Sequence, residues 1–516
     1  MEKETKTASL PAAPEAIPEG RSYWILLAAL FLLPRIVRLL YPYVWFEDPF
    51  YLYAARLVEH GLVPYRDFNH VQLPGAEYLL SALYSLFGTS YRAAEIFSQT
   101  AVYANTWLIY LTGRKLCGGT AGLSSAVIFS CSSLVFRYHV WERELLVLLL
   151  VTLVFYLLLR WEKLDRPRSL ALGLIFAAGI FIKLTTVVPL AAALLFIAVV
   201  RKEVKSALVT GLSALVFTLL AVSWFFSLAG AENFFIQAFF VHFVKGVTSD
   251  SRLAALLYPL YTLDITAVLG ILGVFFWKKK FPAAAWYPAL VLLVYWAFLT
   301  FVSHTVWPHN FVYFLPFLSL SGGVFLAALY EMAWTKRKFL APFSLAAAAL
   351  LLLASAVPLK NANWVMGGAY GFGYIPRKDV AEISSFIRAN TASTDLLLLP
   401  QHIAAESGRE TVLSETMDTP GLIGRVEGKR KNKAGLREIL GLAKFKTYTQ
   451  MTREVSELGW GSAASLLKQR KLKYVVLTTV PADNCPFSAQ YLRSLGYAPA
   501  RQVGGYEAWS LVPELR

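Results

Sequence analysis

Charged side chains gather among aromatic residues in one short stretch, residues 45–75. Glu47 and Asp48 stand near its start, and Arg66, Asp67 and His70 follow. Paired carboxylates beside cationic groups and an imidazole can carry out proton transfer and can stabilise a developing charge. The stretch is therefore predicted to be an active site.

A short helix is expected to position these residues. Asp48 followed by Pro49 is typical of an N-cap and the first helical position. Apolar residues recur at helical spacing from Phe50 to Val58, and Gly61 can end the helix. Such an amphipathic helix is expected to lie along a membrane surface, with its positive N-terminus facing the loop. Asp48 as a cap alone is the structural alternative, and the two roles are compatible.

The composition is that of a polytopic membrane protein. Of the 516 residues, 57% are hydrophobic and 16% are charged, and the mean hydropathy is +0.51. This is too apolar for a soluble globular protein. A net charge of +16 could favour nucleic acid, but the basic residues form short clusters between apolar runs. Cytoplasmic anchoring explains that pattern, so no nucleic-acid partner is expected.

The apolar runs predict about eleven membrane spans, several of them near the lower limit of ~17 residues for a crossing. They lie at about residues 24–40, 94–112, 118–136, 144–160, 169–182, 187–200, 206–225, 261–277, 283–302, 310–332 and 339–357. Basic clusters occupy every second connection, which places those connections and the N-terminus in the cytoplasm. The C-terminus then lies outside. The candidate chemical residues fall on the remaining connections and share that outer face.

The chain is predicted to form three parts. Residues 1–22 are a polar cytoplasmic tail, residues 23–360 a transmembrane catalytic domain with an outer loop at 41–93, and residues 361–516 an extracytoplasmic soluble α/β domain. In this last part we expect strands at 395–400, 473–480 and 506–512, and helices at 376–390, 433–442 and 462–471. It contains no Gly-rich phosphate loop, metal-ligand spacing or catalytic triad pattern.

An ordered set of motifs resembles the GT-C superfamily of glycosyltransferases. The motifs are Glu47-Asp48-Pro49-Phe50-Tyr51, Pro64-Tyr65-Arg66-Asp67, His70, Pro74-Gly75, Arg143-Glu144, Lys183 and the run from His309 to Pro316. The group that they resemble includes the dolichyl-phosphate-mannose protein mannosyltransferases and the bacterial aminoarabinose transferase of lipid A. The resemblance implies a polytopic α-helical GT-C fold in the plasma membrane.

The resemblance also implies a reaction. A hexose or pentose would pass from a polyprenyl-phosphate donor to a protein, lipid or glycan acceptor on the extracytoplasmic face. Inverting attack needs a carboxylate base. Relatives commonly read Asp-Glu where this chain reads Glu47-Asp48; alignment on Tyr51 selects Glu47, and alignment with relatives that have a single Asp there selects Asp48. Asp48 is favoured as the base, and Glu47 is a close second. Fixed positive charge can stabilise the departing phosphate. The candidates for this charge are Lys183, which is favoured by position, and Arg143, Arg35 and Arg38.

Further residues are expected to contact the substrates. They are Tyr51, Arg66, Asp67, His70, Glu144, His309 and Tyr313. Glu142 is the alternative to Glu144, and both could instead pair with Arg137 and Arg143 as a structural ion network. No metal site is predicted, because no carboxylate–histidine pairing with ligand spacing exists, although acidic loops permit a divalent cation.

Two other classes of function stay open. A transporter or flippase of lipid-linked sugars would place ionisable residues near the bilayer midplane, often within repeated halves. Here the charges lie at span ends, and no internal repeat is apparent. A non-catalytic scaffold whose outer domain binds a partner would leave the acidic first loop unexplained.

Overall fold

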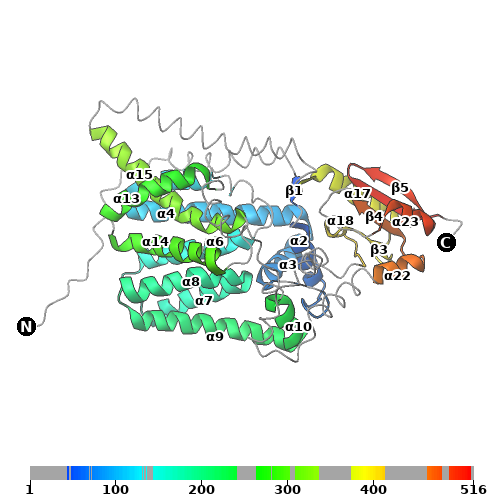
Figure 1. Cartoon of the computed structure of the whole chain (residues 1–516), viewed down its shortest axis with the longest axis horizontal. Helices are drawn as coiled ribbons and strands as arrows, with labels where there is room; N and C mark the ends of the chain where they lie inside the picture. The colour runs from blue at the N-terminus through cyan, green and yellow to red at the C-terminus, as the bar shows by residue number, and fades with distance from the viewer. Residues whose placement is uncertain are drawn as a thin grey trace, which may run out of the picture.

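The computed structural model describes residues 43–45, 48–68, 70, 72–130, 132, 135, 143–240, 263–280, 282–302, 308–335, 374–412, 462–478 and 487–512. Long helices form a bundle at one end of the molecule, and a smaller region with strands and short helices lies at the other (Figure 1). Two helices, α2 (Asp48–Glu59) and α3 (Gly75–Phe87), lie between these two parts.

The helical bundle follows the long apolar runs of the sequence. Its helices are α4 (Tyr91–Ser130), α6 (Arg143–Arg160), α7 (Arg166–Ile182), α8 (Val187–Leu195), α9 (Val204–Ala229), α13 (Asp264–Lys280), α14 (Pro282–Ala297) and α15 (Leu315–Thr335). Short 3₁₀ and π segments adjoin them at η1 (Leu184–Thr186), η2 (Phe196–Val200), η3 (Ile236–Phe240), η4 (Phe298–Val302) and η5 (Pro308–Phe314), and α10 (Ala231–Phe235) follows α9. The predicted helical architecture is confirmed, while the number of spans stays a prediction.

The surface of α9 is mostly apolar and exposed. Leu208, Leu212, Leu220 and Trp224 are each at least half exposed. Apolar surface of this extent is unfavourable in water and suits a hydrocarbon environment. In the described part of the chain, Val204–Ala229 and Asn310–Tyr330 are long and apolar enough to cross a membrane. Both coincide with predicted spans.

The chain folds back sharply within α4. Cys117 and Gly118 leave the helical conformation, and Gly118 has a φ of 83°, which favours glycine. The segments on either side pack closely, because a Cβ atom on Gly113 would lie 2.9 Å from Cα of Gly122. This tight helical hairpin agrees with the break expected between the spans at 94–112 and 118–136.

The C-terminal region, defined here as the described residues from 374 onward, contains a sheet in the order β3-β4-β6-β5. Its strands are β3 (Leu397–Leu398), β4 (Tyr474–Thr478), β5 (Tyr497–Val503) and β6 (Tyr506–Leu511), and its helices are α17 (Arg377–Asn390), α18 (Gln401–Ser407), α22 (Ser462–Lys468) and α23 (Ala489–Ser494). β3 and β4 are parallel, and the other neighbours are antiparallel. Trp509 is buried in its core.

The strands and helices of this region largely match the sequence prediction. β3, β4 and β6 fall within the three predicted strands, and α17 and α22 within the predicted helices. The prediction did not include β5, because this edge strand has mainly exposed residues and lacks an apolar run. The helix expected at 433–442 lies outside the described residues.

A small two-stranded sheet joins the segment before α2 to the C-terminal region. β1 (Tyr43–Trp45), just before α2, pairs antiparallel with β2 (Tyr374–Pro376), just before α17. Backbone hydrogen bonds therefore connect the segment just before α2 with the start of the C-terminal region. Sequence spacing gave no sign of this pairing, because the strands are short and far apart in the chain.

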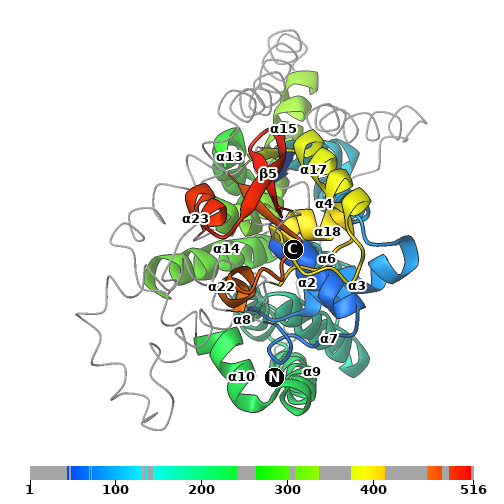
Figure 2. The same ribbon diagram turned by 90° about the vertical axis from the view of Figure 1, so that its right-hand side faces the viewer.

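Helix α2 is covered by protein on both sides. It packs against α3 and α18, and the residues from Leu52 to Val58 are all buried. Figure 2, in which the C-terminal region faces the viewer, shows α18 in front of α2. The sequence predicted a helix lying on a membrane surface. The helix is found where it was expected, but α18 covers the face that the pattern assigned to water or headgroups.

A buried cation fastens this junction. Arg56 donates from Nη1 to the carbonyl oxygens of Ala404, at 2.7 Å, and Arg409, at 3.2 Å. These carbonyls lie at and just beyond the C-terminal turn of α18, where positive charge is favourable. The carbonyl of Ala404 also accepts from the backbone N–H of Arg409 at 3.1 Å, so Arg56 adds a charged donor to an existing cap. Arg56 thus joins α2 to the negative end of α18.

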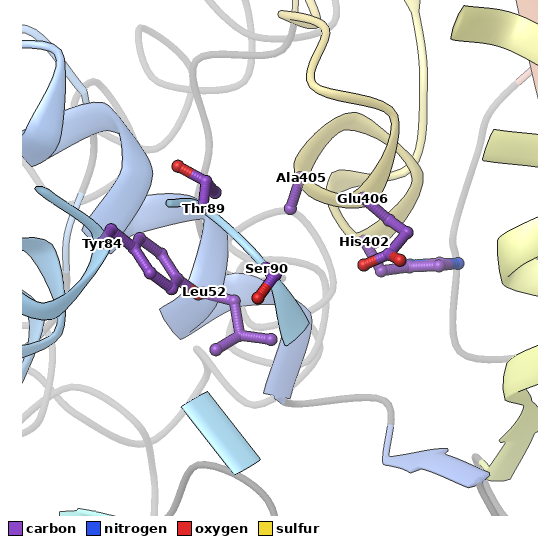
Figure 3. A pocket seen from close by; sticks show the side chains of 7 residues that line it. All are labelled: Leu52, Tyr84, Thr89, Ser90, His402, Ala405 and Glu406. Carbon is purple, nitrogen blue, oxygen red and sulfur yellow. The ribbon is translucent and has the colours of Figure 1, made fainter. Parts of the chain in front are cut away.

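A small cavity, with a size suited to a single water molecule, lies at the same junction (Figure 3). Its lining residues are Leu52, Tyr84, Thr89, Ser90, His402, Ala405 and Glu406. The Nε2 atom of His402 is 2.7 Å from the hydroxyl oxygen of Tyr506, and burial lowers the pKa of His402 to about 3. The imidazole is therefore neutral near pH 7, and it links α18 to the sheet.

Candidate active site

Some of the predicted site residues lie close together, near the point where α2 and α6 begin and α7 ends. Helix α2 begins at Asp48, as the Asp48-Pro49 pair predicted. The structure describes the backbone of Asp48 and of His309 but not their side chains. Glu47, Glu142, Arg35 and Arg38 lie outside the described residues.

A buried ionic group, which we call the Arg143 cluster, holds the segment from α2 to the start of α3 against the bundle. It consists of Tyr51, His70, Gln72, Glu77 and Arg143. The guanidinium of Arg143 donates to Oε1 of Glu77 and, at 2.6 Å, to Oε1 of Gln72. Its Cζ atom lies 4.1 Å from the ring centroid of Tyr51, a cation–π geometry. Nε2 of His70 is 3.5 Å from Oε2 of Glu77.

Charges within the Arg143 cluster compensate one another. Burial alone would raise the pKa of Glu77, but the guanidinium of Arg143 and the neighbouring His70 bring it below its ordinary value. Burial is also the main reason why the pKa of His70 is lowered, against the opposing effect of Glu77. Glu77 is therefore ionised against Arg143, and His70 is neutral near pH 7.

A second ion pair lies one residue further along α6. Glu144 accepts a hydrogen bond from Nζ of Lys183, and both side chains are largely buried, at 8% and 14% exposed. Lys183 follows directly on the last turn of α7, and its backbone N–H bonds to the carbonyl of Gly179. Spacing along the chain does not indicate this pairing, because Glu144 and Lys183 belong to different helices.

Close packing of α3 on α7 brings the two ion pairs to the same end of the bundle. A Cβ atom at Gly75 would lie 2.7 Å from the carbonyl oxygen of Phe181. This contact is with backbone, so no rotation of a side chain could relieve it. Gly75 therefore allows the start of α3, and with it Glu77, to approach the end of α7 near Lys183.

The rest of the loop is held by backbone contacts. Gln237 of η3 accepts from the backbone N–H of His70 at 2.9 Å and donates to the carbonyl of Tyr65 at 3.2 Å. Tyr65 is buried, has a φ of 67°, and donates its hydroxyl to the carbonyl of Gln72. A non-glycine residue in this conformation persists only where its surroundings fix it, so the loop has a defined shape.

Other predicted substrate contacts have different surroundings. Arg66 and Asp67 form an ion pair at 2.8 Å with side chains 50% and 25% exposed, and this bond lowers the pKa of Asp67. Oδ2 of Asp67 also accepts from the backbone N–H of Val63 at 2.7 Å, which closes a local turn. Tyr313 is buried in the bundle, with its ring 4.7 Å from that of Tyr295. The structure thus brings Tyr51, His70, Arg143, Glu144 and Lys183 together, and places the Arg66–Asp67 pair on the surface.

Sequence reasoning missed Glu77, Gln72 and Gln237. Glu77 is the single charged residue of α3, whose other residues are apolar or small and neutral. A lone carboxylate on a helix that must bury its face requires a cation, and this signal was available in the sequence. Gln72 and Gln237 carried no comparable signal. Among the described residues, no group of three or more His, Cys, Asp or Glu side chains could hold a metal ion.

Comparison with known proteins gives matches of two kinds. Residues 71–226 match the family described as dolichyl-phosphate-mannose-protein mannosyltransferase. No curated protein matches the chain in sequence. The matched segment includes Glu77, Arg143, Glu144 and Lys183, all of which lie at the site described above.

Solved structures match the fold over nearly the whole chain. ArnT from Cupriavidus metallidurans, bound to undecaprenyl phosphate, is 12% identical and has a TM-score of 0.64, with 96% of this chain and 98% of ArnT covered. The archaeal oligosaccharyltransferase AglB from Archaeoglobus fulgidus, in complex with an inhibitory peptide and a dolichol-phosphate, is 13% identical. Its TM-score is 0.52, with 89% of this chain and 69% of AglB covered. In fold over almost its whole length, and in sequence over residues 71–226, the chain resembles the GT-C superfamily of glycosyltransferases.

Proposed function

We propose that the protein is a membrane glycosyltransferase that moves a sugar from a polyprenyl-phosphate donor to an acceptor on the extracytoplasmic face. One observation carries the proposal. The first two residues of α6 contact residues from both parts of the proposed site: Arg143 lies against Tyr51, one turn from the proposed base Asp48, and Glu144 pairs with Lys183, the proposed phosphate-binding residue. The lipid phosphates bound to ArnT and AglB support a donor of the same class.

The proposed reaction uses these groups in named roles. A hydroxyl or other nucleophile of the acceptor attacks the anomeric carbon, while Asp48, or alternatively Glu47, accepts its proton. The bond from the anomeric carbon to the phosphate oxygen breaks, and polyprenyl phosphate leaves with inversion at the carbon. The ammonium group of Lys183 stabilises the departing phosphate while it also remains paired with Glu144. Arg35 and Arg38 are further candidates for this charge, and Arg143 is already paired with Glu77.

A transfer assay tests this proposal. The purified protein would be reconstituted into vesicles with tritiated undecaprenyl-phosphate mannose, glucose or arabinose, and membrane fractions would be supplied as acceptor. We expect label to move from one donor into an acceptor product. A transporter or flippase would instead carry labelled donor across the vesicle bilayer without forming a product. That result would contradict the transferase proposal and support the transporter alternative.

Replacement of Lys183 by alanine should weaken the use of donor. We expect kcat/KM to fall at least ~10-fold at limiting donor, because removing one preorganised positive group from a developing anion is costly. Lys183→Arg should retain part of the activity, and Lys163→Ala, an exposed lysine between α6 and α7, should behave as wild type. Normal turnover of folded Lys183→Ala at limiting donor would show that the phosphate is bound elsewhere.

The proposed orientation can be tested with a pair of introduced cysteines. In a cysteine-free background, Ser494→Cys in the C-terminal region should react with a membrane-impermeant thiol reagent in intact cells. Lys163→Cys, in a connection predicted to be cytoplasmic, should react only after permeabilisation. Both positions are exposed, so accessibility is matched. The reverse pattern would contradict the orientation derived from the basic clusters.

A further inference from the structure

We infer that Glu77 is a positioning residue for the proposed transfer: it holds Arg143 against Tyr51 and thereby fixes the first turn of α2. The inference rests on the proposed function for its kinetic consequences. The statement that the Glu77 carboxylate fixes the first turn of α2 does not depend on the proposed function.

Arg143 is anchored from three directions. Glu77 and Gln72 accept hydrogen bonds from its two terminal nitrogens, and the ring of Tyr51 lies against its guanidinium plane. Its side chain is only 2% exposed, so bulk water does not replace a lost partner. Of these three contacts, only Glu77 supplies a compensating charge.

Loss of that charge should displace the guanidinium. A buried cation that loses its anion keeps its desolvation cost without the attraction that offset it. His70 cannot take over, because its imidazole is neutral or positive and shares the same carboxylate. Arg143 would therefore move toward another anion or toward solvent, and its contact with Tyr51 would be lost.

Tyr51 transmits this displacement to the proposed base. It lies one helical turn after Asp48 in α2, so the cation–π contact restrains the turn that begins at the carboxylate. Transfer requires the base and the anomeric carbon to be held within a fraction of an ångström, and a misplacement of about 1 Å can cost ~100-fold in rate. Glu77 therefore acts on catalysis through Arg143 and Tyr51 without touching the substrate.

Four variants separate positioning from simple structural support. Glu77→Gln removes the charge at nearly constant size, and Glu77→Asp retains it. The double variant Glu77→Gln/Arg143→Gln removes both charges and leaves no buried ion unpaired. Ser81→Ala is the matched control, because Ser81 is also buried, lies one turn further along α3 and carries no charge.

Three measurements are made on the full-length protein in detergent: thermal unfolding, amide hydrogen exchange of peptides covering residues 48–59, and transfer from whichever of the three tritiated donors is active. We expect Glu77→Gln to exchange faster in α2 and to lose ~10- to 100-fold in kcat with little change in the KM for donor. Glu77→Asp should recover most of the kcat. The double variant should regain thermal stability but not kcat, and Ser81→Ala should match wild type in kcat.

Unchanged exchange in α2 together with wild-type kcat in Glu77→Gln would overturn the inference. So would a double variant that regains kcat along with stability, since the pair would then be structural only. Failure of the proposed function is distinguishable, because the wild-type protein would show no transfer from any of the three donors, whereas the exchange measurement would still report on Glu77.

Discussion

Replacement of Asp48 by asparagine should lower turnover at least ~100-fold, the lower range for loss of a general base. Asparagine has nearly the same size and is also a good helix cap, so α2 should still begin at this position. The positive end of the helix favours the ionised carboxylate and reduces its basicity. A weak base is sufficient here, since the acceptor proton need only leave late, when the bond to the sugar is largely formed.

The measurement compares kcat per folded molecule with thermal unfolding, which should change little. Glu47→Gln is the control, because it removes the neighbouring carboxylate of the same sequence pair. If Glu47→Gln abolishes transfer and Asp48→Asn does not, Glu47 is the base and Asp48 only caps the helix. Full activity in both variants would show that neither carboxylate takes part in catalysis, and the transferase proposal would lose its main support.

Replacement of Arg56 by alanine should detach the C-terminal region from α2. The change leaves at least two carbonyls near the end of α18 without their charged donor and opens space in a packed junction. Hydrogen bonds from a charged group to buried carbonyls contribute ~1.5–3 kcal/mol, so we expect a loss of about 2–4 kcal/mol in the free energy of unfolding. Because α2 carries the proposed base, transfer activity should also fall when α2 loses its contact with α18.

Limited proteolysis of the C-terminal region and thermal unfolding in detergent would report this loss. Arg388→Ala is the matched control. Arg388 donates to the carbonyls of Ser407 and Glu406 on the same helix end, but it reaches them from α17 within the C-terminal region. It should therefore loosen α17 from α18 and leave α2 docked. Equal effects of the two variants on activity would show that Arg56 has no special part in fastening α2.

Much of the local structure could be predicted from the sequence. The Asp48-Pro49 pair placed the start of α2, and apolar runs placed the bundle helices and three of the four strands of the C-terminal sheet. These features depend on residues close together in the chain. Their physical causes, such as capping, helical periodicity and burial of an apolar run, act over the same short range.

The pairing of charges could not be predicted in the same way. Arg143 and Lys183 were both expected to be available to a phosphate, but the structure pairs them with Glu77 and Glu144. Each pair joins different helices, and helix packing, which local spacing does not encode, decides which carboxylate meets which cation. The position of α2 under α18 escaped prediction for the same reason, because an amphipathic helix looks alike beneath protein and beneath lipid headgroups.

The length of α9 has a consequence for the membrane that surrounds the protein. With 26 residues at about 1.5 Å each, the helix is ~39 Å long, whereas the hydrocarbon core of a bilayer is ~30 Å thick. A helix of this length that crosses the bilayer tilts or protrudes, and its angle depends on the chain length of the surrounding lipids. Gln237 lies in η3, which follows α9 and α10, and it is bonded to His70 and Tyr65. A change in the tilt of α9 would therefore reach the loop that follows α2 through α10 and η3.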